Sequence, residues 1–142
     1  ADTDEARGNR RAMQARLAEH GPAAIAADMV PKLLGATSLR EHPALRDDLR
    51  GIIEATSREA IHDAIECLMW RADASQLLPT IAVPTLIVAG RDDVLTPVAL
   101  HEKMHAAIPH ATLEIIEGAG HLANLERPDA VTPLIGRFAA AL

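Results

Sequence analysis

An acidic pair and a histidine occupy matching positions in the last third of the chain. The acids lie in Gly90-Arg91-Asp92-Asp93, after the apolar run 84–89, and the histidine lies in Gly118-Ala119-Gly120-His121, after the run 111–117. A carboxylate that accepts a hydrogen bond from an imidazole fixes the tautomer of the ring and stabilises its protonated form. These residues are therefore candidates for the acid and the base of a hydrolytic triad, if the fold brings the two loops together.

The segments around these loops predict a strand–helix–strand unit. Short β-branched runs that end at Gly90 and near Gly118 are typical of buried strands. Between them, Thr96-Pro97 predicts a helix start, with Thr96 as N-cap and Pro97 as the first helical residue. Apolar residues then repeat every four positions, at Leu100, Met104 and Ile108. Such a crossover joins parallel strands whose carboxyl ends meet at one edge, where open α/β sheets bind ligands.

The third member of a triad is not found in the sequence. A nucleophile elbow has the pattern Gly-x-Ser-x-Gly, and none of Ser38, Ser57 and Ser75 has that setting. The single cysteine, Cys67, falls within an apolar helical pattern, which is typical of packing. Two parallel strands alone do not make a stable open sheet. We therefore expect the chain to be the C-terminal part of a larger α/β domain.

Composition limits the classes of partner. The 142 residues carry a net charge of −6, which argues against a nucleic-acid surface or an anionic membrane as the partner. No apolar run is long enough to span a bilayer. One cysteine cannot form an internal disulfide, so nothing indicates a disulfide-stapled secreted domain. These features predict a cytoplasmic protein.

Helical patterns fill the chain before the first strand. A helix over residues 4–19 should stop at His20-Gly21-Pro22, and a second should run to about Gly35, with Pro31 bending it or ending it early. A third helix follows Pro43. A fourth begins at Thr56-Ser57-Arg58-Glu59, which has the capping-box pattern with Thr56 as the cap.

One motif points to different chemistry. His101-Glu102-Lys103-Met104-His105 matches H-E-x-x-H, the zinc-protease signature, on a predicted helix. The extended form of the motif with a third histidine is absent, because Ala106-Ala107-Ile108-Pro109 follows. This helix is also already placed as the crossover between the strands. We therefore predict no catalytic metal and no cofactor.

The chain resembles the cap domain and C-terminal core of α/β-hydrolase-fold enzymes, in particular cap-bearing esterases and the enol-lactonases of aromatic degradation. The motifs that carry the resemblance are Val83-Pro84-Thr85-Leu86-Ile87-Val88-Ala89-Gly90-Arg91-Asp92-Asp93, Thr96-Pro97, Ile108-Pro109 and Gly118-Ala119-Gly120-His121-Leu122-Ala123-Asn124-Leu125-Glu126-Arg127-Pro128. The resemblance implies an α/β fold: an incomplete parallel sheet with its last two strands here. It assigns residues 1–55 to a helical cap or lid and residues 56–142 to the core.

The family pattern also implies roles for individual residues. It makes Asp93 the triad acid, with Asp92 as the fallback, and His121 the general base. Candidate pocket-lining residues are Leu122 and Leu125 in the core and Ile25, Met29, Leu33, Ile52 and Ile53 in the cap helices.

The implied function is hydrolysis of a small hydrophobic ester or lactone. By the resemblance, the serine and the oxyanion hole lie on an N-terminal segment of the same hydrolase, which is the expected partner. The chain alone is then expected to be inactive. Two alternatives stay open: a relative with different chemistry, such as a haloalkane dehalogenase with an Asp nucleophile or a cofactor-free haloperoxidase, and a non-catalytic binding module with the same fold.

Overall fold

The computed structural model describes residues 1–142, which form two compact units. The first contains Ala1–Val30 and Asp47–Ser75, and the second contains Pro31–Arg46 and Gln76–Leu142. Packing within the chain defines these units, whereas the division into a cap and a core rests on the family resemblance. The division at residues 55 and 56 therefore stays a prediction. No helix combines the length and apolar character needed to cross a bilayer.

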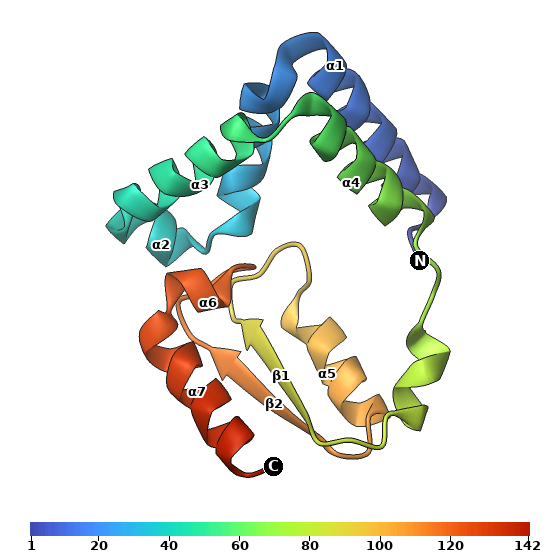
Figure 1. Cartoon of the computed structure of the whole chain (residues 1–142), viewed down its shortest axis with the longest axis vertical. Coiled ribbons are helices and arrows are strands. Elements are labelled where there is room, and N and C mark those ends of the chain that lie inside the picture. The colour runs from blue at the N-terminus through green and yellow to red at the C-terminus, as the bar shows by residue number, and fades with distance from the viewer. The chain divides into compact units, whose positions relative to one another are not determined.

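The first unit is built from helix α1 (Asp4–Leu33) up to Val30, most of α3 (Pro43–Ala55) and α4 (Arg58–Trp70). The predicted stop near residue 20 is a kink, visible in Figure 1, at which Gly21 has a φ of 76°. This positive φ favours glycine. The guanidinium of Arg58 donates to the carbonyl oxygens of Leu17 and Ala18, at 3.3 and 2.7 Å, just before the kink. Pro31 does not end α1, which runs on to Leu33.

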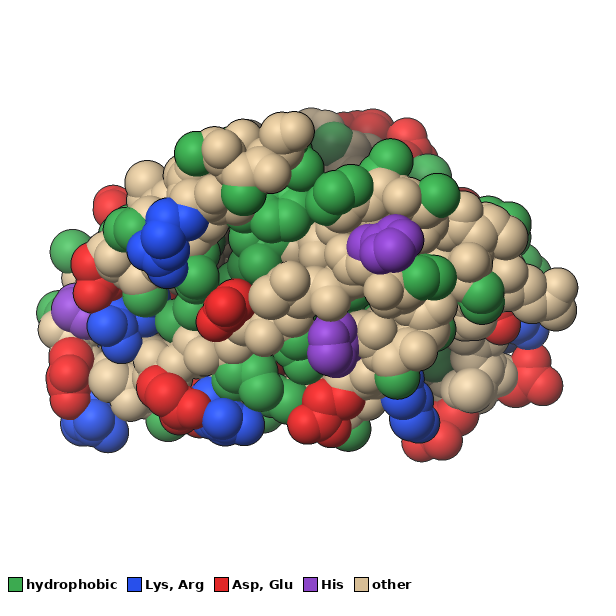
Figure 2. Space-filling model, turned by 90° about the horizontal axis from the view of Figure 1, so that it is seen from below, with side chains coloured by type: hydrophobic (Ala, Val, Ile, Leu, Met, Phe, Trp, Pro, Cys, Tyr) green, Lys and Arg blue, Asp and Glu red, His purple; other side chains and the backbone are tan.

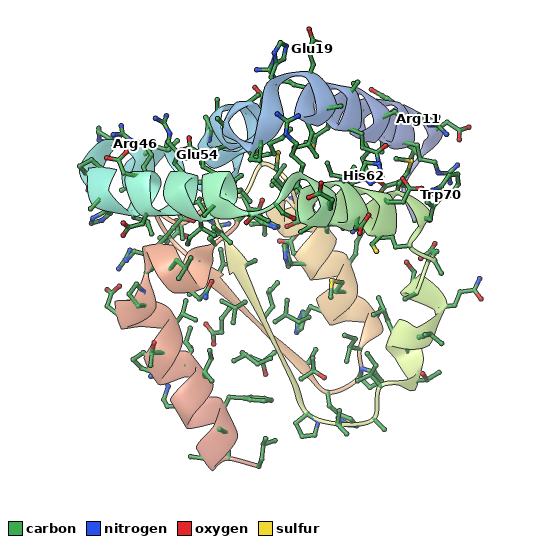
Figure 3. The ribbon with its side chains drawn as sticks, turned by 45° about the horizontal axis from the view of Figure 1, so that its top comes forward. Arg11, Glu19, Arg46, Glu54, His62 and Trp70 are labelled. Atoms are coloured by element: carbon green, nitrogen blue, oxygen red, sulfur yellow. The ribbon has the colours of Figure 1, made fainter.

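Helix α4 packs on α1 in this first unit. The buried core residues are Leu17, Ile25, Ile65 and Met69. The cap of α4 is Ser57, whose side chain accepts from the backbone N–H of Ala60 at 3.1 Å. The prediction of Thr56 as the cap is therefore wrong by one residue. Figure 3 labels His62 and Trp70 on this helix, and the Trp70 indole, which is largely exposed, donates to Glu66.

The second unit contains the predicted strand–helix–strand element. Strands β1 (Thr85–Gly90) and β2 (Ala111–Ile116) pair in parallel, from Thr85 opposite Ala111 to Gly90 opposite Ile116. The crossover between them is α5 (Val98–Ala107). The prediction of two parallel neighbouring strands is confirmed, and the two following loops leave the same edge of the sheet (Figure 1).

Helices lie on both sides of the strand pair in this unit. Helix α7 (Pro128–Ala140) packs through Val131 and Leu134 on the face that carries Val88 and Ile116. Figure 1 shows α5 on the opposite side of the strands. The shorter helices are α2 (Ala36–Glu41), η1 (Ser75–Thr80) and α6 (Ala123–Glu126). Helix α2 had no sequence signal that predicted it.

Candidate active site

The two loops at the carboxyl edge are held together by backbone contacts. The N–H of Arg91 donates to the carbonyl of Ile116, and the N–H of Asp92 donates to the carbonyl of Ala119, both at 2.9 Å. Glycines make this approach feasible: a β-carbon on Gly90 would lie 2.0 Å from the carbonyl oxygen of Gly120. The loop that follows β1 and the loop that precedes α6 therefore form one closely packed substructure.

A methyl group at residue 120 should push the histidine loop away from the segment of Leu34 and Gly35. The β-carbon of Gly120→Ala would lie 2.4 Å from the backbone nitrogen of Gly35 and 2.8 Å from the carbonyl carbon of Leu34, so backbone must move. We expect the variant to lose about 1–3 kcal/mol of unfolding free energy, the usual cost of overpacking. Chemical denaturation of both proteins measures this loss.

A glycine on α7 provides the matched control for this substitution. A β-carbon on Gly136 would meet nothing within 4 Å. Because alanine favours helix over glycine by up to about 1 kcal/mol, Gly136→Ala should be neutral or stabilising. Equal stability of Gly120→Ala and the unchanged chain would contradict the close packing of Gly120 against Leu34 and Gly35.

The structure brings Asp93 and His121 into direct contact. The Nδ1 atom of His121 lies 2.9 Å from Oδ2 of Asp93. The Asp93 side chain is 4% exposed and the His121 side chain is 35% exposed, so the carboxylate is buried behind a ring that still reaches the surface. Asp92, the fallback, is exposed and makes no hydrogen bond to the ring. The sheet geometry thus pairs the histidine with the acid that the family pattern indicated.

The local backbone holds the Asp93 carboxylate in place. Its Oδ1 accepts from the N–H groups of Leu95 and Thr96, at 2.8 and 2.9 Å, as in an Asx turn. Its Oδ2 accepts from the hydroxyl of Thr96, at 2.6 Å, in addition to the imidazole. Both oxygens therefore have partners, and the carboxylate has one orientation toward the ring.

Thr96 has a different role from the predicted one. Helix α5 begins at Val98, and Pro97 rather than Thr96 is in the N-cap position. The prediction of Thr96 as the cap is wrong because its hydroxyl and its N–H both bind Asp93. The same hydroxyl lies 3.3 Å from Nδ1 of His121. The spacing Asp-x-x-Thr after a strand was the available signal for this turn.

The environment of Asp93 favours its charged form. Burial raises the pKa of this carboxyl, but hydrogen bonds from the Thr96 side chain and N–H, the His121 ring and the Leu95 N–H outweigh it and leave the pKa below its ordinary value. At neutral pH the group beside Nδ1 is therefore a carboxylate. A carboxylate can only accept, so in the neutral ring Nδ1 carries the proton and Nε2 keeps its lone pair.

This lowered pKa predicts an acid-sensitive contribution to stability. A carboxyl whose folded pKa is below its unfolded value of about 3.9 stabilises the fold above that pH, and the contribution is lost as the pH falls through the folded pKa. The difference in unfolding free energy between the unchanged chain and Asp93→Asn should therefore shrink as the pH falls below about 4. Denaturant titrations of both proteins at several pH values measure it; a constant difference down to about pH 2 would contradict it.

The ring nitrogen that faces away from Asp93 is free to act. Nε2 of His121 makes no hydrogen bond within the chain, whereas Nδ1 is held by Asp93 and Thr96. An imidazole oriented in this way can take a proton from a hydroxyl and return it to a leaving group. Because none of the three serines lies in either loop, the pair can act as acid and base only toward a nucleophile from another segment.

The predicted pocket-lining residues are divided between the units. In the second unit, Leu33 accepts hydrogen bonds at its carbonyl from the N–H groups of His121 and Leu122, at 3.1 and 3.3 Å, while Leu125 is exposed. In the first unit, Ile25 is in the core with Met29 and Ile53 packed against it, and Ile52 is exposed. Their role as pocket lining stays a prediction.

The histidines of the H-E-x-x-H motif lie on α5, as predicted. No third His, Cys, Asp or Glu joins His101 and His105 in a group that could hold a metal ion. A second buried carboxylate, that of Glu126, lies beside the histidine loop and was not assigned a role from the sequence. It is 4% exposed and accepts from two backbone N–H groups.

Comparison with known proteins places the chain in a family. The model of the alpha/beta hydrolase family matches residues 2–134. The 3-oxoadipate enol-lactonase 2 of Acinetobacter baylyi is 31% identical over 133 residues, which is 92% of this chain and 49% of the lactonase.

Solved structures agree with this match. The thermophilic esterase of Thermogutta terrifontis is 33% identical, with a TM-score of 0.93 over 99% of this chain and 52% of the esterase. The enol-lactonase of Burkholderia xenovorans LB400 is 25% identical, with a TM-score of 0.85 over 96% of this chain and 50% of the lactonase. This chain thus spans about half the length of these relatives. The predicted resemblance to esterases and enol-lactonases is confirmed, and the chain belongs to the alpha/beta hydrolase family.

Proposed function

We propose that this chain supplies the acid and the base of a serine-type ester or lactone hydrolase. The contact between Nδ1 of His121 and the buried Asp93 carboxylate carries the proposal. In the proposed reaction, Nε2 of His121 takes the proton of a serine hydroxyl while the serine oxygen attacks the acyl carbon. The histidine then gives that proton to the leaving alcohol, and later activates a water that releases the acid. Asp93 orients the ring and balances its positive charge.

The serine belongs, in this proposal, to an N-terminal segment of the same hydrolase. The exposed apolar residues of the second unit support such a partner: they include Leu77, Val83, Leu100, Met104 and Ile135. Figure 2 shows hydrophobic side chains gathered among charged ones on the face it presents. Both outer edges of the two-stranded sheet are also unpaired, so strands from a partner can extend it.

The substrate class in this proposal is a small hydrophobic ester or lactone. The esterase and enol-lactonase names of the relatives support this class. Acyl transfer by a serine, a histidine and an aspartate needs no metal or organic cofactor. The candidate liners named above, all of them Leu, Ile or Met, suit an apolar pocket.

The first test is to identify the nucleophile. A native preparation is examined by denaturing mass spectrometry, before and after treatment with a fluorophosphonate that labels activated serines. The proposal expects a labelled serine in a Gly-x-Ser-x-Gly sequence, on a second polypeptide or on a chain continuous with this one, and hydrolysis of p-nitrophenyl butyrate. An associated segment without such a serine, carrying an aspartate nucleophile in its place, would overturn the serine mechanism.

A further inference from the structure

The backbone of the histidine loop depends on a carboxylate that the proposed reaction does not use. Oε1 of Glu126 accepts from the N–H of Gly120, at 2.8 Å, and its Oε2 accepts from the N–H of Gly35, at 2.7 Å. Gly120 directly precedes His121. Glu126 lies at the end of α6, six residues after Gly120 in sequence, whereas Gly35 is 91 residues before it.

This carboxylate is enclosed. Glu126 is 4% exposed, and Gly35 and Gly120 are buried. A buried carboxylate is costly unless its oxygens are hydrogen-bonded, and each oxygen here has a backbone donor. A β-carbon on Gly35 would lie 2.9 Å from the Gly120 nitrogen, so the two donors can converge on one carboxylate only because both residues are glycines.

The same two segments are joined a second time, by hydrogen bonds between backbone groups. The carbonyl of Leu33 accepts from the N–H groups of His121 and Leu122. The backbone N–H groups of residues 120, 121 and 122 are therefore all bound, one by Glu126 and two by Leu33. These bonds fix the backbone from which the His121 ring projects, and hence the distance from its Nδ1 to Asp93.

We propose that Glu126 is a positioning residue for His121: its carboxylate joins the Leu33–Gly35 segment to the histidine loop and so holds the ring against Asp93. The inference rests on the proposed function for the role of His121 as base, but the geometry it concerns is independent of any nucleophile. Losing the carboxylate frees the N–H of Gly120 and lets the loop relax away from Gly35. The ring then no longer has a single orientation toward Asp93.

Glu126→Gln tests the proposal, because the amide has the shape of the carboxylate but can accept at only one of the two positions. In the isotope-labelled full chain, two signals are read: hydrogen exchange at the amides of Gly35 and Gly120, and the His121 tautomer from two-bond ¹H–¹⁵N correlations of the neutral ring. We expect slow exchange and a single Nδ1–H tautomer in the unchanged chain. In the variant, exchange at one or both glycines should be at least about tenfold faster and both tautomers should appear.

Glu117→Gln is the matched control. Glu117 lies in the same loop, but it is exposed and its carboxylate pairs with Arg91 instead of the loop backbone. Its removal should leave the glycine exchange rates and the His121 tautomer unchanged. Glu126→Asp is the second variant, and it decides the question if Glu126→Gln does not fold. Its charge is kept but its reach is shorter, so we expect one protected glycine amide and a partly mixed tautomer.

Two outcomes would overturn the proposal. In the first, a Glu126 variant melts at a lower temperature while His121 keeps its single tautomer, which makes Glu126 a purely structural residue. In the second, the Gly35 and Gly120 amides already exchange rapidly in the unchanged chain, so the carboxylate does not hold them. Neither readout needs a substrate or a serine. The positioning role of Glu126 can therefore be refuted while the proposed hydrolase function stands, and the hydrolase function can be refuted while the positioning role stands.

Discussion

Replacing His121 by alanine in the active hydrolase is expected to lower kcat/KM for a p-nitrophenyl ester by at least about 10⁴-fold. The ring is the only group beside Asp93 that can accept a proton from a nucleophile and return it to the leaving group. The loss should fall on kcat, with little change in KM, because the imidazole acts on the reacting atoms and contributes little to substrate binding. Steady-state kinetics of the assembled enzyme measure both constants.

A second histidine provides the control for that substitution. His105 is exposed on α5 and belongs to no group that could bind a metal. His105→Ala should keep turnover within about twofold of the unchanged enzyme, as expected for a surface change away from the site. If His121→Ala kept its turnover, the hydrolase would use no histidine base, and a binding role for this chain would become the better explanation.

The part of the fold that carries the site could be predicted because its signals are local. The runs that become β1 and β2 are short and apolar, and a crossover of this length permits only a parallel pair. Once the strands are parallel neighbours, the loops after Gly90 and Ile116 must leave the same edge. The meeting of an acid and a histidine followed from this topology, and the family pattern was needed only to choose Asp93 over Asp92.

Helix starts were predicted less well because the hydroxyl of a predicted cap can bind another acceptor, as those of Thr96 and Thr56 do. Thr96 precedes a proline and has the chemistry of an N-cap, yet Asp93 binds both its N–H and its hydroxyl. In the same way, Thr56 fits a capping box, but Ser57 is the cap. Sequence spacing identifies the region in which a helix begins to within one or two residues. The hydrogen bonds that form in the folded chain decide which of these residues is the cap.

The role of Glu126 lay beyond sequence reasoning for a different reason. A glutamate at the end of a short helix is usually solvated, but Glu126 is buried because it binds Gly35, which is 91 residues away. No pattern within a helix or a loop reports such a distant partner. The one available sign was that a charged residue, Glu126, directly follows the largely apolar stretch Leu122-Ala123-Asn124-Leu125 after His121.

Asp93→Asn is expected to lower kcat by about 10⁴-fold, the loss seen when a triad histidine is held in the wrong tautomer. The hydrogen bonds around the carboxylate dictate how the amide would sit. Its oxygen must take the place of Oδ1, because the N–H groups of Leu95 and Thr96 both require an acceptor there. Its NH₂ group then takes the place of Oδ2, beside the Thr96 hydroxyl and Nδ1 of His121.

In that arrangement the amide donates to Nδ1, so the proton of the neutral ring moves to Nε2. An Nε2–H nitrogen has no lone pair for the serine proton, and the base is lost although the fold and the contacts of His121 are kept. Asp92 is an exposed neighbour without a hydrogen bond to the ring, so Asp92→Asn is the control and should retain full turnover. The ring tautomer, read from ¹H–¹⁵N correlations, separates this mechanism from unfolding. If the variant kept the Nδ1–H tautomer, this mechanism would be refuted. The amide would then have the opposite orientation: its oxygen would accept from Nδ1 of the ring, and its NH₂ group would face the N–H groups of Leu95 and Thr96.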